Sequence, residues 1–224
     1  MGVLLVLWGW FALTTFFAIN PIVAQHKLFE VSKLLVPMLF IGILIDSKEK
    51  LRWLLITLAL SIAAIIFKGG YWALIHGFQD RVYGPDGSAY GGNNEFAVAT
   101  CMAIPLLVFW YQSLRGQAWR WAVAGLVVLA FISAISSWSR GGLLSVMAVT
   151  LLLIWQSPRK WLAIPLLVIG MIFLFFSLPD AWVERMQTLG APQLEGSAAS
   201  RLAIWRIGWN YAVSHPLFGS GFES

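Results

Sequence analysis

Two arginines in this sequence of 224 residues could bind a phosphate group. Arg140 stands in Ser139-Arg140-Gly141-Gly142, inside the longest apolar region, and Arg201 stands near the start of a predicted helix. A guanidinium group matches phosphate oxygens through two parallel hydrogen bonds and stays charged at any working pH. Pyrophosphate becomes a good leaving group once its charge is stabilised, so these residues predict group transfer from a bound pyrophosphate.

A reaction of this kind also needs a base for the incoming hydroxyl group, usually a histidine or a carboxylate. His215 is the histidine nearest to Arg201 and is the candidate, although a histidine before a proline is more often a capping or surface residue. The acidic residues of the segments expected on the same side are scattered and form no Asp-x-Asp pair: Asp80, Asp86, Asp180 and Glu184. The sequence therefore favours charge stabilisation by arginine, with no metal and no other cofactor.

A glycine-rich segment, residues 79–95, could line the same site. In the functional interpretation, Tyr90, Asn93 and Asn94 contact a sugar or a phosphate, and Ser139 is a further candidate lining residue. In the structural interpretation the segment is a turn-rich linker, and Asn93 or Asn94 caps the next helix. A nucleotide-binding P-loop is excluded because the segment lacks Gly-Lys-Ser/Thr.

The position of Arg140 predicts how the chain around it folds. Arg140 lies about midway between Arg120 and Arg159, which flank the apolar region. A single helix over this region would be roughly 57 Å long, about twice the thickness of a hydrocarbon core. We therefore expect two membrane helices that fold back at Gly141-Gly142, with Arg140 at the tip. A charge at such a tip is costly unless it meets water, headgroups or an anion.

The composition predicts an all-α, polytopic membrane protein. Hydrophobic residues make up 59% of the chain and charged residues only 11%, against about 25% charged residues in soluble domains. We expect about seven spans, near residues 2–19, 31–45, 51–67, 95–113, 121–138, 142–157 and 161–178. Many tryptophans fall at the expected span ends, as in an interfacial belt: Trp53, Trp72, Trp110, Trp119, Trp121, Trp138, Trp155 and Trp161. The single cysteine, Cys101, offers no disulfide.

Charge predicts the orientation of these spans. The formal net charge of +5 gathers in the second, fourth and sixth connections, which hold seven Lys and Arg residues against Asp46 and Glu49. We assign these short connections to the cytoplasm. All three histidines and the two longest polar segments then face outward. The basic character reflects topology and predicts no nucleic-acid partner.

The chain divides into a transmembrane bundle, residues 1–179, and the start of an outer, partly helical loop, residues 180–224. In that loop, Ser197 or Ser200 would cap a helix with Arg201 in its first turn, where only a bound anion makes a cation favourable. A solvated surface position is the alternative for Arg201. Arg206 lies about 140° further round the helix. We expect it to face elsewhere, and we keep it as a candidate lining residue.

Three motifs together resemble the O-antigen ligase and polymerase superfamily. They are Ser139-Arg140-Gly141-Gly142, then Ser200-Arg201-Leu-x-x-Trp205, then the segment from His215-Pro216-Leu217 to Gly219-Ser220-Gly221-Phe222. The segment from Tyr83 to Ser88, with Asn93-Asn94, looks more narrowly like the O-glycosylation ligases associated with exosortase systems.

The resemblance implies a bacterial inner-membrane glycosyltransferase of lipopolysaccharide or exopolysaccharide biosynthesis. Such an enzyme moves a glycan from polyprenyl pyrophosphate to a glycan, lipid or protein acceptor on the periplasmic side, without a metal. The family's two pyrophosphate-binding arginines map onto Arg140 and Arg201. Its catalytic histidine follows the Pro-Leu-x-Gly-x-Gly segment, which argues against His215. This chain ends before that point, in mid-loop, so we expect a fragment of a longer protein.

Three function classes remain open from the sequence. An enzyme that transfers lipid-linked glycan, as a ligase or as a polymerase, is favoured by the two arginines and the motif order. A transporter would carry charges near the middle of its spans, and here Glu30, Lys33 and Lys68 lie only near span ends. A scaffold subunit of an export assembly would not depend on the arginines.

Overall fold

The computed structural model describes residues 1–158, 160–187, 196–216 and 219, and over these residues the predicted all-α fold is confirmed. The chain forms two compact units. One comprises Met1–Leu51 and Ala191–Ser224, and the other comprises Arg52–Gly190. Each is described by itself below.

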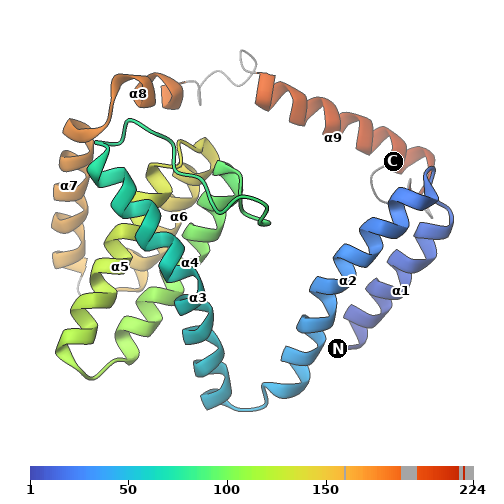
Figure 1. Cartoon of the computed structure of the whole chain (residues 1–224), viewed down its shortest axis with the longest axis horizontal. Helices are drawn as coiled ribbons and strands as arrows, with labels where there is room; N and C mark the ends of the chain where they lie inside the picture. Colours follow the sequence, from blue (N-terminus) through green and yellow to red (C-terminus); the bar gives the residue numbers. More distant parts are fainter. Residues whose placement is uncertain (159, 188–195, 217–218, 220–224) are drawn as a thin grey trace. The chain divides into compact units, whose positions relative to one another are not determined.

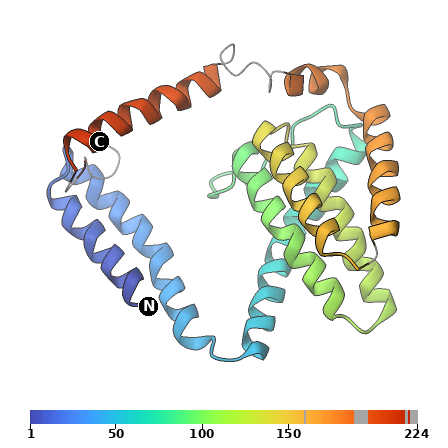
Figure 2. The ribbon, with the colours of Figure 1, turned by 180° about the vertical axis from the view of Figure 1, so that it is seen from behind.

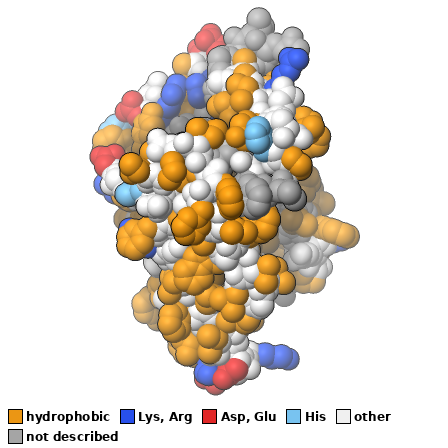
Figure 3. Space-filling model, turned by 90° about the vertical axis from the view of Figure 1, so that its right-hand side faces the viewer, with side chains coloured by type: hydrophobic (Ala, Val, Ile, Leu, Met, Phe, Trp, Pro, Cys, Tyr) orange, Lys and Arg blue, Asp and Glu red, His pale blue; other side chains and the backbone are white. Residues whose placement is uncertain are grey.

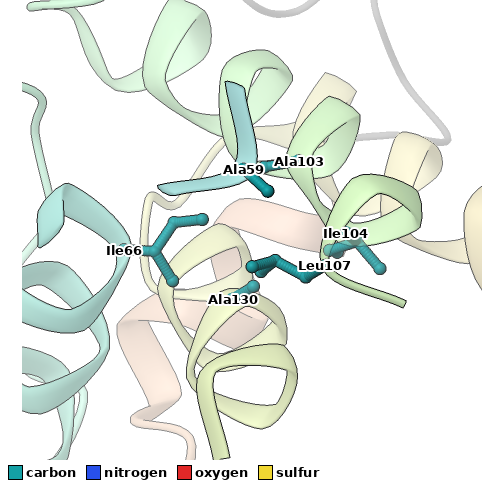
Figure 4. Packing of buried hydrophobic residues seen from close by; sticks show 6 residues of the cluster. All are labelled: Ala59, Ile66, Ala103, Ile104, Leu107 and Ala130. Atoms are coloured by element: carbon teal, nitrogen blue, oxygen red, sulfur yellow. The ribbon is translucent and has the colours of Figure 1, made fainter. Parts of the chain in front are cut away.

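The second unit is a helical bundle. Its helices are α3 (Lys48–Ile75, which begins in the first unit), α4 (Asn93–Ser113), α5 (Gln117–Ile135), α6 (Arg140–Gln156), α7 (Lys160–Ser177) and α8 (Asp180–Gln187). Helix α4 packs against both α5 and α6, and these three lie side by side (Figures 1 and 2). A buried cluster from α3, α4 and α5 joins them (Figure 4): Ala59, Ile66, Ala103, Ile104, Leu107 and Ala130. The alternation of alanine with larger residues lets the helix backbones approach closely.

The first unit contains α1 (Gly2–Phe16), α2 (Pro21–Leu44) and α9 (Gly196–Ser214). Helices α1 and α2 pack together, and the indole of Trp8 donates a 2.8 Å hydrogen bond to Ser32 Oγ. The sequence predicted a connection over residues 20–30, and this prediction is wrong because α2 already begins at Pro21. Asn20 Oδ1 accepts from Val23 N, and proline suits the first helical position, so the helix starts there.

Helix α3 also runs further than expected. The sequence placed the end of this span near residue 67, but α3 continues to Ile75 through Gly69 and Gly70. These glycines do not break the helix. A Cβ on Gly70 would lie 2.7 Å from the carbonyl oxygen of Leu129 in α5, and a Cβ on Gly69 would meet Ser133 Oγ. The glycines therefore allow α3 to pack closely on α5.

Within the part of the chain that the structure describes, three helices, α3, α4 and α5, are long and apolar enough to cross a membrane, and α1, α6 and Lys160–Leu174 of α7 are shorter apolar helices. Many large hydrophobic side chains are exposed in both units, and Figure 3 shows how widely they cover the face on the side of α1 and α2. A surface of this kind is stable in a hydrocarbon environment and not in water. The exact count of seven spans stays a prediction.

The second unit has a basic end where α3 begins, α4 ends and α5 begins. Arg52 Nη2 donates a 3.2 Å hydrogen bond to the carbonyl oxygen of Ser113, and the Arg120 guanidinium lies 4.8 Å from the centre of the Tyr111 ring. The α3–α4 loop, the α5–α6 turn and α8 lie at the opposite end, because the helices between them run the full length of the bundle (Figure 1). Successive connections of this unit therefore alternate between its two ends, as the charge pattern predicted.

Candidate functional site

The turn next to Arg140 lies a few residues earlier in the chain than the sequence predicted. Helix α5 ends at Ile135 and α6 begins at Arg140, so the chain reverses over residues 136–139 and not at Gly141-Gly142. The cause is the N-cap of α6. Ser139 has extended backbone dihedrals, and its Oγ accepts a 3.0 Å hydrogen bond from the amide of Gly142. Both glycines are therefore inside the first turn of α6.

Gly142 is required for packing and not for the turn. A Cβ on Gly142 would lie 2.6 Å from the Cβ of Ala97 in α4 and 3.1 Å from the Cβ of Ser139. At Gly141 the nearest such atom, Ser139 Oγ, is 3.9 Å away, so that position has room for a side chain. The glycine at position 142 thus sets how closely α6 approaches α4.

One interpretation of the sequence expected Asn93 or Asn94 to cap α4, but neither residue does so. The N-cap is Gly92, and no side chain caps that helix end. Asn93 Nδ2 instead donates to the carbonyl oxygen of Ser137 at 3.0 Å, and Asn94 Oδ1 accepts from Ser139 Oγ at 2.7 Å. The two asparagines therefore bind the start of α4 to the α5–α6 turn.

Ser139 and Tyr90, two candidate lining residues, have different surroundings. Ser139 is 3% exposed, and its hydroxyl group accepts a hydrogen bond from Gly142 N and donates one to Asn94 Oδ1. These contacts give Ser139 a structural task, the positioning of its neighbour Arg140. Tyr90 is exposed in the loop between α3 and α4, where a Cβ on Gly84 would collide with its carbonyl oxygen. Close backbone packing thus orders that loop.

Arg140 is half-buried and is the first residue of α6. The helix dipole places partial positive charge at this helix end. The guanidinium of Arg140 and the helix terminus therefore both attract a negative charge. The sequence assigned that geometry to Arg201, and this assignment is wrong. Helix α9 begins at Gly196, so Arg201 is its sixth residue, and Ser197 and Ser200 lie inside the helix.

Arg201 and Arg206 are both exposed along α9, and His215 is exposed just beyond its end. The His215 ring stacks on Tyr211 with 4.3 Å between ring centres, and Ser214 Oγ lies 3.0 Å from His215 Nδ1. These residues belong to the first unit, whereas Arg140 belongs to the second. The convergence of Arg140 with Arg201 on one anion stays a prediction.

Two arginines that the sequence did not single out for the site, Arg81 and Arg185, contact Trp138, which lies two residues before Arg140. Trp138 was expected in the interfacial belt, but it is only 8% exposed and packs with Ile135, Trp182 and Met186. Its φ of 57° is unusual for a bulky residue. Arg185 Nε, from α8, donates a 2.9 Å hydrogen bond to the carbonyl oxygen of Trp138. The Arg81 guanidinium lies 5.4 Å from the centre of the Trp138 ring.

The sequence holds a partial signal for this arrangement. Trp182 and Arg185 are three residues apart on α8 and therefore share a face of the helix. Trp182 Nε1 donates to the carbonyl oxygen of Ile135 at 3.1 Å, so this face covers the α5–α6 turn. Within the described residues, no group of three His, Cys, Asp or Glu side chains is placed to hold a metal ion.

Two family models match the chain. Residues 1–115 match a family of unknown function (DUF5935), and residues 125–224 match the O-antigen ligase family. The second match contains Arg140, Arg201 and His215. It supports the O-antigen ligase superfamily for this part of the chain and, with the apolar helices, a multi-pass membrane enzyme of O-antigen ligase or polymerase type. No curated protein and no solved structure matches the chain.

Proposed function

The chain belongs to a family of unknown function (DUF5935), whose model matches residues 1–115, and residues 125–224 match the O-antigen ligase family. From this premise we propose that the protein is a membrane glycosyltransferase that moves a glycan from polyprenyl pyrophosphate to an acceptor hydroxyl group. The donor is lipid-linked, so the enzyme takes it from the bilayer in which its own apolar helices lie.

The geometry of Arg140 carries this proposal. A half-buried arginine at the first residue of a membrane helix adds its fixed charge to the positive end of the helix dipole. The N-cap Ser139 and its partner Asn94 hold that helix start in place. A preorganised positive charge of this kind stabilises the negative charge that develops on a departing pyrophosphate.

In the proposed reaction, the bond between the sugar's anomeric carbon and the pyrophosphate oxygen breaks. A bond from that carbon to the acceptor oxygen forms. The electron pair leaves with the pyrophosphate, where Arg140 and Arg201 bind it. The acceptor's proton passes to a base. His215 is the candidate within this chain, and its exposed ring has Nδ1 beside Ser214 Oγ. The resemblance to the superfamily argues for a different histidine in that role.

The finer assignments follow from the sequence patterns. The active face is periplasmic in a bacterial inner membrane, because the basic connections are assigned to the cytoplasm. Residues 1–179 form the membrane bundle of about seven spans, and 180–224 begin the periplasmic loop. The segment around Tyr83 and Asn93-Asn94 favours the exosortase-associated O-glycosylation ligases. The acceptor, whether a lipid, a growing glycan or a protein, distinguishes a ligase from a polymerase.

The test is a chromosomal Arg140→Ala substitution in the native strain, with the glycosylated product as the readout. We expect the product to disappear while the protein still inserts into the membrane at its normal level. Arg140→Lys should also fail, since an ammonium group lacks the guanidinium's planar pair of donors. Arg120→Ala, at the opposite end of the bundle, is the control and should leave the product unchanged.

A normal amount of product from both Arg140 variants would refute the proposed enzyme. Solute transport by the reconstituted protein without any glycan product would instead indicate a transporter. A stable complex with export proteins, unaffected by the arginine substitutions, would indicate a scaffold subunit.

A further inference from the structure

The basic end of the second unit carries positive charge alone among its described residues. Arg52 lies near the start of α3, Arg115 in the α4–α5 connection and Arg120 near the start of α5. Lys160, the first residue of α7, follows the α6–α7 connection at the same end. The carboxylates of the described part of this unit lie instead in the α3–α4 loop, at the start of α4 or in α8: Asp80, Asp86, Glu95, Asp180 and Glu184.

Two of these arginines are held by neutral groups at the end of α4. Arg52 Nη2 donates a 3.2 Å hydrogen bond to the carbonyl oxygen of Ser113, and the Arg120 guanidinium lies 4.8 Å from the centre of the Tyr111 ring. A guanidinium has five N–H donors, so the bond to Ser113 leaves most of the Arg52 donors available. Neither a carbonyl oxygen nor a ring carries net charge. The contacts position the two side chains without neutralising them.

Arg115 lies beside this anchored pair and is exposed. It follows Ser113 by two residues, so their Cα atoms are at most about 7 Å apart. The Arg115 side chain has no hydrogen bond, ion pair or ring contact with any residue that the structure describes. Arg52 and Arg115 therefore offer two guanidinium groups to one ligand at the end of α4.

Exposed tryptophans gather at the same end: Trp53, Trp119, Trp121, Trp155 and Trp161. Their side chains are 60–73% exposed. The tryptophans towards the opposite end are less exposed, at 43% for Trp72, 8% for Trp138 and 9% for Trp182. Indole rings prefer the headgroup level of a bilayer, where their apolar body meets lipid and their N–H meets water. The arginines beside the exposed tryptophans therefore lie at the depth of lipid phosphates.

We propose that this end of the second unit binds the headgroup of a phospholipid with a net negative charge, and that Arg52 and Arg115 hold its phosphate group. A zwitterionic headgroup fits less well, because its own cation would meet an end that is entirely basic. A water-soluble anion offers the same phosphate chemistry but makes no use of the exposed tryptophans and apolar helix sides. The inference goes beyond the proposed function and involves neither Arg140 nor Arg201.

The test counts the lipids that stay bound to the whole chain in native mass spectrometry, from micelles with equal amounts of phosphatidylglycerol and phosphatidylcholine. We expect the wild-type chain to retain phosphatidylglycerol preferentially. Arg52→Gln and Arg115→Gln should each lower the apparent affinity for phosphatidylglycerol about fivefold, the effect of one cation near an anionic lipid surface. Arg115→Gln removes no contact with a described residue, so it decides the result even if Arg52→Gln fails to fold.

Arg81→Gln provides the matched control at the opposite end of the unit. Arg81, like Arg115, is an exposed arginine in a connection between helices. Its removal changes the net charge equally and should leave the affinity for phosphatidylglycerol within about twofold of the wild type. Equal losses in Arg81→Gln and Arg115→Gln would show an effect of overall charge and overturn the proposal. Equal retention of the two lipids by the wild-type chain would also overturn it.

A second arm separates a lipid headgroup from a free anion. The measurement is repeated with inorganic phosphate in excess over phosphatidylglycerol, and with sodium chloride at the same ionic strength to account for screening. Equal retention of phosphatidylglycerol in the two salts supports a lipid surface. Displacement by phosphate but not by chloride would assign Arg52 and Arg115 to a soluble anion and overturn the proposal.

Discussion

Ser139 links the cap of α6 to α4 through one hydroxyl group, which accepts from Gly142 N and donates to Asn94 Oδ1. We expect Ser139→Ala to lower the free energy of unfolding by about 1–3 kcal/mol, because it removes the cap and leaves a partly buried amide oxygen unpaired. Unfolding in mixed micelles with increasing denaturing detergent measures this change.

Ser145 provides the control in the same helix. Its hydroxyl group donates to the carbonyl oxygen of Gly141, one turn back, and has no second partner among the described residues. Ser145→Ala should therefore change the stability by less than about 0.5 kcal/mol. Equal losses in the two variants would contradict the bridging task assigned to Ser139.

At the residue scale, the sequence identifies Arg140 better than it identifies its surroundings. A lone arginine deep in an apolar region is informative, because its burial is costly without a purpose. Trp138 gave the wrong prediction, since a tryptophan near a span end fits an interfacial belt as well as a buried core. Arg81 and Arg185 carry no pattern of their own. Only their contacts with Trp138 single them out.

The α4–α6 contact permits a prediction at the scale of elements. Gly142→Ala should destabilise the bundle by about 1–3 kcal/mol, because its Cβ would enter the space of Ala97 and Ser139. Gly141→Ala, one residue before it, has room and replaces a helical glycine, so it should be neutral or stabilise by up to about 1 kcal/mol. Thermal unfolding in detergent distinguishes the two. A more damaging Gly141 variant would show that the glycines serve the turn.

Helix boundaries explain most of the differences between the predicted and observed elements. Hydrophobic periodicity located the apolar part of each helix, but α2 and α3 extend into polar sequence that the pattern assigned to connections. Asn20-Pro21 is a helix-start signal that the charged residues after it obscured. Gly69-Gly70 resembles a break until the neighbouring helix is known. The α5–α6 hairpin was predictable because its length matched two spans.

At the scale of the whole molecule, the sequence predicts the fold class and the alternation of the connections between the two ends of the bundle. It does not predict the distances between residues that are remote in sequence. Arg140 and Arg201 belong to different compact units, and no local pattern reports how far apart two such residues lie. Charge counting is more informative, because the short basic connections follow every second helix. In the second unit the contacts of Arg52 and Arg120 are indeed at the end opposite to the α5–α6 turn.

The orientation of the whole chain is open to a direct labelling experiment. Cys101 is the only cysteine and is 3% exposed, so Cys101→Ala gives a background without reactive thiols. In this background, Ala89→Cys lies exposed in the α3–α4 loop and Gln117→Cys lies exposed at the start of α5. A membrane-impermeant maleimide added to spheroplasts should label the cysteine at position 89 and leave that at position 117 unlabelled until the membrane is opened. The opposite labelling pattern would place the Arg140 end of the bundle in the cytoplasm, where no periplasmic acceptor could be reached.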